Sequence, residues 1–256
     1  MPNWNGDLDD SAGHRPRIRH KSAAPQRAVR GRGVEILDTE GVDPAVVRRS
    51  LRDVAVANRL LGGTRAVLLS LQTVFAELPR CATLLDVGSG VGDIPARARR
   101  AAAQVGIALE TVGMDASETA VKESRSRTSV ALCGDVRALP FFDKSVDVVT
   151  CSQVLHHFFD GDVPCVLREL DRVARVRVIV SDLQRARVAA AAIWTSSFIF
   201  GFHPVSRHDG VVSVMRGFTA DELAEAVQSA TGRTPVVQRR LGYRLTASWT
   251  PTPSVG

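Results

Sequence analysis

The hydrophobic and polar positions in the first third of the chain follow a helical period. Apolar residues recur there every three or four positions, which predicts two helices. The first begins at Asp43-Pro44, an N-cap followed by proline at the first helical position, and it ends at Gly62-Gly63. The second runs from Thr64 to Pro79. Both helices precede the first strand-like run, so we expect them to extend a domain that starts later.

From residue 82 onward, short apolar runs alternate with helical segments. The runs cover residues 83–87, 109–114, 130–133, 146–151 and 176–180, and helical segments lie at 93–105, 117–126 and 161–174. Strands that are apolar on both faces and separated by helices predict a parallel sheet with helices on two sides. Two late runs, 235–240 and 243–249, predict a terminal antiparallel pair joined at Gly242. The fold class is therefore α/β, with a doubly wound sheet and a helical N-terminal extension.

Charge and cysteine content narrow the choice of partners. The net charge is +6, but seven of the 33 basic residues lie at positions 15–32, in a stretch without apolar periodicity. We therefore expect residues 1–34 to form a disordered basic tail. The four cysteines form no CxxC, and the longest uncharged stretch, 188–202, is shorter than the roughly 20 residues of a membrane span. These features predict a cytoplasmic protein without a transmembrane segment.

Alternate glycines follow the first strand in "LLDVGSGVGDIP", residues 84–95. Gly88, Gly90 and Gly92 leave backbone N–H groups and a helix N-terminus open to a polar ligand. The spacing differs from the dinucleotide pattern GxGxxG, and no Walker lysine follows. Asp93 at the helix start would repel a pyrophosphate, so a ligand with an ammonium group is the better fit.

Polar residues also end the next three strands. Asp115 is placed to accept both hydroxyls of a ribose, although capping the next helix would explain it too. Asp135 can accept from the exocyclic amine of an adenine. The fourth strand leads into Ser152-Gln153 and the pair His156-His157. Because parallel strands end at the same edge of a sheet, the four motifs predict one crevice at its switch point.

The series "LLDVGSGVGDIP", "VGMDAS" and "GDVRALPFFDKSVDVVTCSQVLHHF" resembles the motifs of class I S-adenosylmethionine-dependent methyltransferases. The likeness covers residues 82–182 and is strongest to the small-molecule group that includes ubiquinone- and menaquinone-biosynthesis methyltransferases. It implies a Rossmann-like seven-stranded sheet with an antiparallel last strand, and S-adenosylmethionine as cofactor. The stretches "RSLRDVAVANRLLGGTRAVL" and "HPVSRHDGVVSVMRGFTADEL" are similar to a bacterial subgroup found beside polyketide pathways of secondary metabolism.

The resemblance also implies which residues surround the cofactor. They are Asp86, Gly88, Ser89 and Gly90 at the methionine part, Asp115 at the ribose, Ala116, Asp135 and Val136 at the adenine, and Ser152 and Gln153 at the amino-acid end. Arg65 is a candidate clamp for the cofactor carboxylate, or else part of a solvated helix face. We expect a tail at 1–34, a helical cap at 35–80 and a catalytic domain at 81–256, with a cover over the acceptor at about 184–218.

Histidines are the candidate bases for a hydroxyl acceptor, because their ordinary pKa lies near neutrality. His156 and His157 stand at the mouth of the predicted crevice, where packing or capping is the alternative role. His203 and His208 follow the apolar segment, in "HPVSRHDG", where a solvated loop is the alternative. No carboxylate–histidine spacing on one helical face predicts a metal site.

The apolar segment 188–202 has three interpretations. It can be a core helix, a lid over an apolar acceptor, or an interfacial membrane contact. Trp194, Phe198 and Phe202 lie four residues apart, so a helix would place them on one face.

The residues together predict transfer of a methyl group from S-adenosylmethionine to a small apolar or aromatic acceptor. O-methylation of a phenolic, quinol or polyketide-like molecule is preferred. Methylation of nucleic acid or protein is an alternative raised by the charge, but Ser152-Gln153 stands where base methylation favours an Asn/Asp-Pro-Pro-Tyr tetrad. A non-catalytic regulatory module that keeps the cofactor pocket is a second alternative. Peripheral membrane contact stays open, and nucleic acid is not an expected partner.

Overall fold

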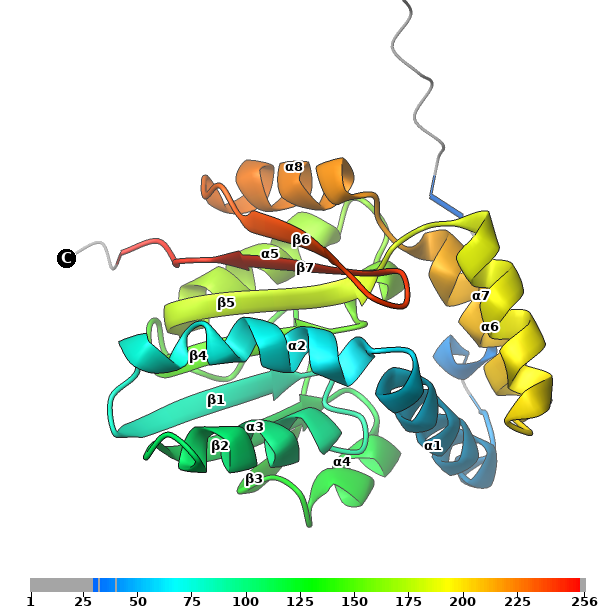
Figure 1. Ribbon diagram of the computed structural model, residues 1–256, viewed down its shortest axis with the longest axis horizontal. Coiled ribbons are helices and arrows are strands. Elements are labelled where there is room, and N and C mark those ends of the chain that lie inside the picture. Colours follow the sequence, from blue (N-terminus) through cyan, green and yellow to red (C-terminus); the bar gives the residue numbers. More distant parts are fainter. Residues whose placement is uncertain (1–29, 32, 40, 254–256) are drawn as a thin grey trace, which may run out of the picture.

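A single mixed sheet of seven strands forms the centre of the molecule (Figure 1). The computed structural model describes residues 30–31, 33–39 and 41–253. The strand order is β3-β2-β1-β4-β5-β7-β6, and β7 runs antiparallel to both of its neighbours. The strands are β1 (Cys81–Val87), β2 (Ala108–Asp115), β3 (Val130–Cys133), β4 (Val146–Ser152), β5 (Ala174–Leu183), β6 (Val236–Arg240) and β7 (Arg244–Trp249). The expected α/β class with an antiparallel last strand is confirmed.

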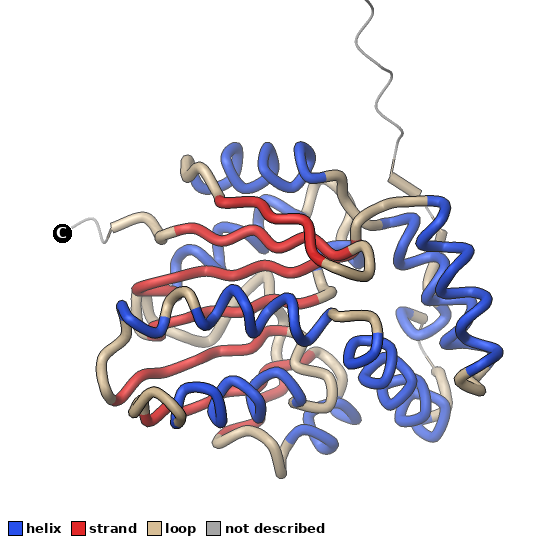
Figure 2. The backbone as a smooth tube through the Cα atoms, viewed as in Figure 1, coloured by secondary structure: helices blue, strands red, loops and turns tan. Residues whose placement is uncertain are grey.

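Helices cover both faces of the sheet, as Figure 2 shows in blue. The helices are α1 (Pro44–Leu60), α2 (Gly63–Gln72), α3 (Asp93–Ala103), α4 (Glu118–Ser124), α5 (Val163–Val173), α6 (Arg187–Ile199), α7 (Pro204–Arg216) and α8 (Ala220–Thr231), with short 3-10 turns η1 (Ile36–Asp38), η2 (Phe75–Glu77) and η3 (Leu155–His157). Leu84 packs with α2 and α3, while its neighbour Leu85 packs with α5 and α8. Successive strand residues thus supply two separate cores.

The second predicted helix differs from expectation in length and in position. It ends at Gln72, and η2 follows as a separate turn. Val67 and Leu71 of α2 are almost completely buried in the core beneath the sheet. Helix α2 therefore belongs to the helical layer on one face of the sheet, together with α3, whereas the expected cap at 35–80 included it. The end of the sheet is instead capped by η1, α1, α6 and α7 (Figure 1).

Helix α7 is an element that the apolar pattern did not reveal. The stretch "HPVSRHDG" begins this helix and is not the solvated loop that we considered. Pro204 occupies the first helical turn, and His203 is the N-cap, whose Nδ1 accepts from the backbone N–H of Val205 at 3.3 Å. The proline after His203 was the feature of the sequence that could have predicted the start of this helix.

The segment before α1 lies along α7. Residues 1–29 and 32 of the predicted tail fall outside the described residues. At its end, however, the Arg30 guanidinium lies 4.1 Å from the centre of the Phe218 ring and pairs with Asp160 at 2.6 Å. The N–H of Gly31 donates to the carbonyl of Met215 at 3.1 Å. Arg30 and Gly31, which we expected within the disordered tail, therefore pack against the folded chain.

No single helix among the described residues is long and apolar enough to cross a membrane. The pair Pro44–Leu60 and Gly63–Glu77 passes that test together, with a bend of 59° between its parts. The buried core residues of α2 account for the apolar character of the second part.

The loop between β3 and β4 is fastened to α5 by one arginine. Arg172 donates to the carbonyls of Leu139 and Phe141 at 3.0 and 2.8 Å, and to the Glu169 carboxylate at 2.7 Å. Glu169 in turn accepts from the N–H of Leu139 at 2.8 Å. This loop starts with the motif at Asp135. Arg172 therefore holds a loop that carries a predicted site residue against helix α5.

Replacing Arg172 with alanine is expected to lower the free energy of unfolding by about 2–3 kcal/mol, since several charge-assisted hydrogen bonds are lost at once. Urea denaturation of the purified protein measures this change. Arg168→Ala, an exposed position on the same helix, is the matched control and is expected to change the free energy by less than about 0.5 kcal/mol. Equal losses in both variants would contradict the assigned role.

Candidate active site

A cavity of about 800 Å³ lies at the carboxyl ends of β1, β2 and β4. Its wall contains residues from all four of the predicted motifs, at Gly88–Gly90, Asp115–Ala116, Asp135–Val136 and Ser152–Gln153. The volume is within the ordinary range for a small-molecule site. The single crevice predicted from the order of strand ends is therefore present in the fold.

The glycine loop brings bare backbone to the cavity. Gly90 has φ of +54°, and no atom lies within 4 Å of the place where a Cβ would stand. Its N–H donates to Oδ2 of Asp115 at 2.9 Å. Gly88 has φ of +69°, and a Cβ there would lie only 2.1 Å from a methyl group of Val154. Gly88 thus allows close packing of the loop, whereas Gly90 leaves room for a ligand.

Asp86 is not on the cavity wall, which corrects the expected contact with the methionine part. It lies inside β1, paired in register with Thr150 of β4, and is almost completely buried. The Thr150 hydroxyl donates to Asp86 Oδ1 at 2.7 Å. Burial raises the pKa of Asp86 to about 8, with further contributions from the charges of Asp93 and Asp115. The raised pKa favours the protonated side chain at neutral pH, and the hydrogen bond from Thr150 joins it to the neighbouring strand β4.

The two other predicted carboxylates differ in environment. Asp115 accepts from the backbone N–H groups of Gly90 and Ser117, and burial raises its pKa. Asp135 is exposed at the cavity mouth, where Arg137 binds it with contacts as short as 2.6 Å and lowers its pKa. Asp115 therefore faces an enclosed space, whereas Asp135 already has a cationic partner.

Two buried hydroxyl groups on the cavity wall have unsatisfied hydrogen-bonding capacity. The Oγ atoms of Ser89 and Ser152 find no hydrogen-bond partner among the described residues. Both serines are more than nine-tenths buried. Buried polar atoms are rarely left unpaired, so their presence indicates that a polar ligand completes this half of the cavity.

Arg65 lies outside the cavity, which corrects its expected role as a carboxylate clamp. Its side chain is exposed on α2. The guanidinium on the wall belongs to Arg244 of β7, which is buried, and burial lowers its pKa to about 10. Arg244 donates to Gln153 Oε1 at 2.8 Å and to Asn58 at 3.3 Å. Gln153 also donates to Asn58 and holds φ of +58°, an uncommon backbone conformation for this residue type.

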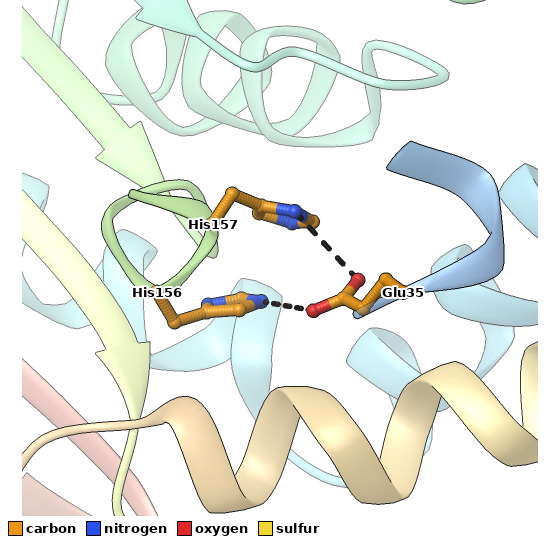
Figure 3. Close-up of side chains that lie close together, drawn as sticks. All are labelled: Glu35, His156 and His157. Atoms are coloured by element: carbon orange, nitrogen blue, oxygen red, sulfur yellow. Dashed lines mark ion pairs between the residues drawn. The ribbon is translucent and has the colours of Figure 1, made fainter. Parts of the chain in front are cut away.

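The far half of the cavity contains a cluster of Glu35, His156 and His157 (Figure 3). Figure 3 shows both imidazole rings pointing at the Glu35 carboxylate. His156 Nε2 lies 3.7 Å from Oε1, and His157 Nδ1 lies 3.6 Å from Oε2. On its other side, His156 Nδ1 lies 2.6 Å from the Asp182 carboxylate. Asp182 thus orients the imidazole ring of His156 so that its Nε2 points toward Glu35.

Charged neighbours shift the pKa values of His157 and of Asp182, which lies beside the cluster. Burial by itself lowers the pKa of His157, but the Asp38 hydrogen bond and the Glu35 charge reverse this and raise the pKa. Burial works in the opposite direction on Asp182, and His156 keeps the pKa of that carboxyl below its ordinary value. Arg216 Nη1 lies 3.6 Å from Glu35 and 3.2 Å from Asp38. The cluster is a dense network of buried opposite charges.

Metal binding is one possible use of this cluster. The ligand atoms of Glu35, His156 and His157 lie within 4.8 Å of one another. Their chemistry suits a divalent transition metal. Arg216 already compensates two of the neighbouring carboxylates, and His157 already contacts Asp38 at 3.0 Å. The carboxylates of Glu35 and Asp38 are therefore already balanced by Arg216 and His157 without a metal ion.

His203 and His208 are not on the cavity wall, contrary to expectation. His203 serves as the N-cap of α7. His208 is exposed and contacts Asp209 at 2.8 Å. Their role as bases in the cavity is therefore not supported by position, and His156 and His157 are the histidines that face it.

Helices α6 and α7 both line the far half of the cavity, through Ile193 and Val214 among others. The core-helix interpretation of 188–202 is wrong, because only Ala189, Ala190 and Ser197 of α6 are buried. Trp194 and Phe198 are exposed and meet edge to face, with ring centres 4.9 Å apart. Phe202 is buried in the turn after the helix and lines the cavity, so it does not share their face.

Several residues of the site were missed from the sequence. Glu35, Asp38 and Asp182 belong to the charged cluster, and Arg244 lies on the cavity wall. Glu35 falls in a short turn without periodicity and beside the predicted tail, so no pattern pointed to it. Asp182 was detectable, because it is a carboxylate at the carboxyl end of the fifth strand.

Comparison with known proteins agrees with this geometry. Residues 85–180 match the family described as "Methyltransferase domain". The chain is 34% identical over 116 residues to a demethylmenaquinone methyltransferase of Roseiflexus sp. strain RS-1, over 44% of this chain and 46% of that protein. A protein of the same name from Thermotoga maritima is 33% identical over 94 residues, covering 36% of this chain and 38% of the relative. The match thus spans less than half the length of these curated relatives.

Solved structures extend the likeness to most of the chain. A SAM-dependent methyltransferase from Aquifex aeolicus superposes with a TM-score of 0.53 at 18% identity, over 82% of this chain and 99% of the other. Magnesium protoporphyrin IX methyltransferase from Synechocystis PCC 6803, solved with bound SAH, gives 0.51 at 17% identity, over 75% and 84% of the two chains. Residues 85–180 therefore match the methyltransferase-domain family, and the chain shares the fold of these solved methyltransferases.

Proposed function

We propose that this chain transfers the methyl group of S-adenosylmethionine to a small apolar or aromatic acceptor. The observation that carries the proposal is the division of one cavity into two chemically different halves. One half combines the glycine loop with Asp115 and two unpaired serine hydroxyls. The other is walled by apolar side chains around the Glu35–His156–His157 cluster.

The first half fits the proposed cofactor. Asp115 has acceptor capacity beyond its two backbone hydrogen bonds, which suits ribose hydroxyls. Asp93 lies on the wall at the start of α3 and suits an ammonium group. Ser89 and Ser152 supply hydroxyls for the remaining polar atoms. When bound, the cofactor supplies a methyl group already activated by a sulfonium, so alignment and exclusion of water are the main tasks of the protein.

The second half fits an apolar acceptor with a hydroxyl group. Leu51 and Val54 of α1, Ile193 of α6 and Val214 of α7 line it. Helices α6 and α7 fall within the cover that we placed at 184–218. The name of the curated relatives, demethylmenaquinone methyltransferase, supports an aromatic acceptor.

O-methylation is the reaction that we prefer, with His156 as part of the base. Its Nδ1 lies against the Asp182 carboxylate, and its Nε2 is directed toward Glu35, which also lines the cavity. We infer that the His156–Glu35 pair takes the proton of an acceptor hydroxyl. A phenolic or quinol acceptor needs its hydroxyl deprotonated for attack from oxygen and from a ring carbon alike. The base therefore supports a hydroxyl-bearing acceptor, on which oxygen is the nucleophile that we prefer.

Replacing Asp115 with alanine is expected to weaken binding of S-adenosylhomocysteine by about 100-fold, because two hydrogen bonds to a charged group are lost. Isothermal titration calorimetry measures the affinity. Arg65→Ala is the control and is expected to leave the affinity unchanged, since Arg65 is exposed outside the cavity. Near-normal binding by the Asp115 variant would remove the cofactor assignment.

Methyl transfer is tested by incubating the protein with methyl-labelled S-adenosylmethionine and a panel of phenols, quinols and aromatic acids. His156→Ala is expected to lower kcat for a hydroxyl acceptor by about 10²–10⁴-fold while cofactor affinity is retained. His208→Ala, which alters an exposed histidine outside the cavity, is the matched control. Label found only on RNA or protein would reject a small acceptor. Cofactor binding without transfer to any acceptor would favour a regulatory module.

A further inference from the structure

The outer side of α6 exposes an unusual run of large apolar side chains. Their exposed fractions lie between 43% and 76%, and the residues are Val188, Trp194, Phe198, Ile199 and Phe200. We call this set the α6 patch. Single exposed apolar residues are common on protein surfaces, but several on one helix and its following turn, two of them in ring contact, indicate a contact surface.

The α6 patch is separated from the cavity by the thickness of one helix. Ala189, Ile193 and Ser196 of the same helix line the cavity, while Trp194 and Phe198 face outward. Figure 1 shows α6 at the right-hand edge of the molecule, next to α7. A molecule that contacts the patch is therefore close to the half of the cavity assigned to the acceptor.

Two arginines lie beside the patch in the chain and lack a carboxylate partner among the ion pairs of the described residues. They are Arg187, which is exposed, and Arg207, whereas the Arg185 side chain is buried and paired with Glu222 at 2.6 Å. The Arg207 guanidinium lies 3.6 Å from the centre of the Phe198 ring. Arg49 of α1 donates to the carbonyl of Gly201 at 2.9 Å, but its charge is already paired with Asp53 at 3.2 Å. The positive charge beside the apolar side chains therefore comes from Arg187 and Arg207.

We propose that the α6 patch docks on the surface of a membrane rich in anionic lipids. Tryptophan and phenylalanine insert at the boundary between head groups and acyl chains, and arginine binds lipid phosphates. A second copy of this chain fits less well, because a two-fold interface would bring like-charged arginines together. If the proposed function holds, the patch also places the cavity beside the bilayer in which an apolar acceptor dissolves.

The proposal is tested by sedimentation of the full chain with vesicles, without cofactor or acceptor. Two compositions are compared, phosphatidylcholine alone and phosphatidylcholine mixed with phosphatidylglycerol. We expect binding to the anionic vesicles and a loss of affinity of about tenfold or more in the double variant Trp194→Ser/Phe198→Ser. Phe142→Ser is the matched control, because Phe142 is 88% exposed in the loop between β3 and β4.

The outcomes separate this proposal from the proposed function. The basic N-terminal residues are present in every variant, so a difference between the two substitutions reports on the patch alone. Equal vesicle binding by the double variant and by Phe142→Ser would overturn the proposal. A stable dimer that the double variant disrupts, seen by light scattering, would instead assign the patch to a second copy. S-adenosylhomocysteine binding in vesicle-free buffer is expected to stay unchanged in both variants, so its loss in the unmodified chain would count against the proposed function only.

Discussion

The site depends on one constraint of parallel β structure, which is that neighbouring strands end on the same side of the sheet. Strands β1, β2, β3 and β4 are paired in parallel, so four loops that are distant in sequence meet above one edge. The backbone at Gly90 then lies within a hydrogen bond of Asp115. Had any of these strands run the other way, its polar terminal residues would lie at the opposite end of the molecule.

The acceptor half of the cavity is assembled differently, because it joins residues that follow β4 to η1, α1, α6 and α7, which lie outside the sheet. Asp209 of α7 accepts from the N–H groups of Ile36 and Leu37 at 2.8 and 3.0 Å, which fixes η1 against α7. Glu35 is thereby held against Ser213 and the two histidines. The carboxylate at the centre of the cluster is positioned by a helix about 170 residues away along the chain.

The fold was predictable from the sequence because its signals are local and repeated. Apolar runs marked every strand, and the motif at each strand end marked one side of the cavity. The acceptor half was less predictable, because side-chain partners across long separations leave no periodic trace. Arg65 and His208 were plausible by residue type, but both are exposed on helix surfaces. Arg244 and Glu35 took roles in the cavity that depend on β7 and η1 folding back toward it.

The packing of residues 33–39 against α7 has a consequence for the order in which parts of the cavity fold. The glycine loop and its neighbours join residues 84–153, whereas the link between Glu35 and Ser213 closes a loop of 178 residues. Long closures cost more chain entropy and form late. Arg244 reaches Asn58 across 186 residues, so the Gln153 end of the cavity also depends on a long closure. We therefore expect the glycine loop and Asp115 to be ordered first during folding, and the two ends of the cavity to be completed only when η1 and β7 have folded back.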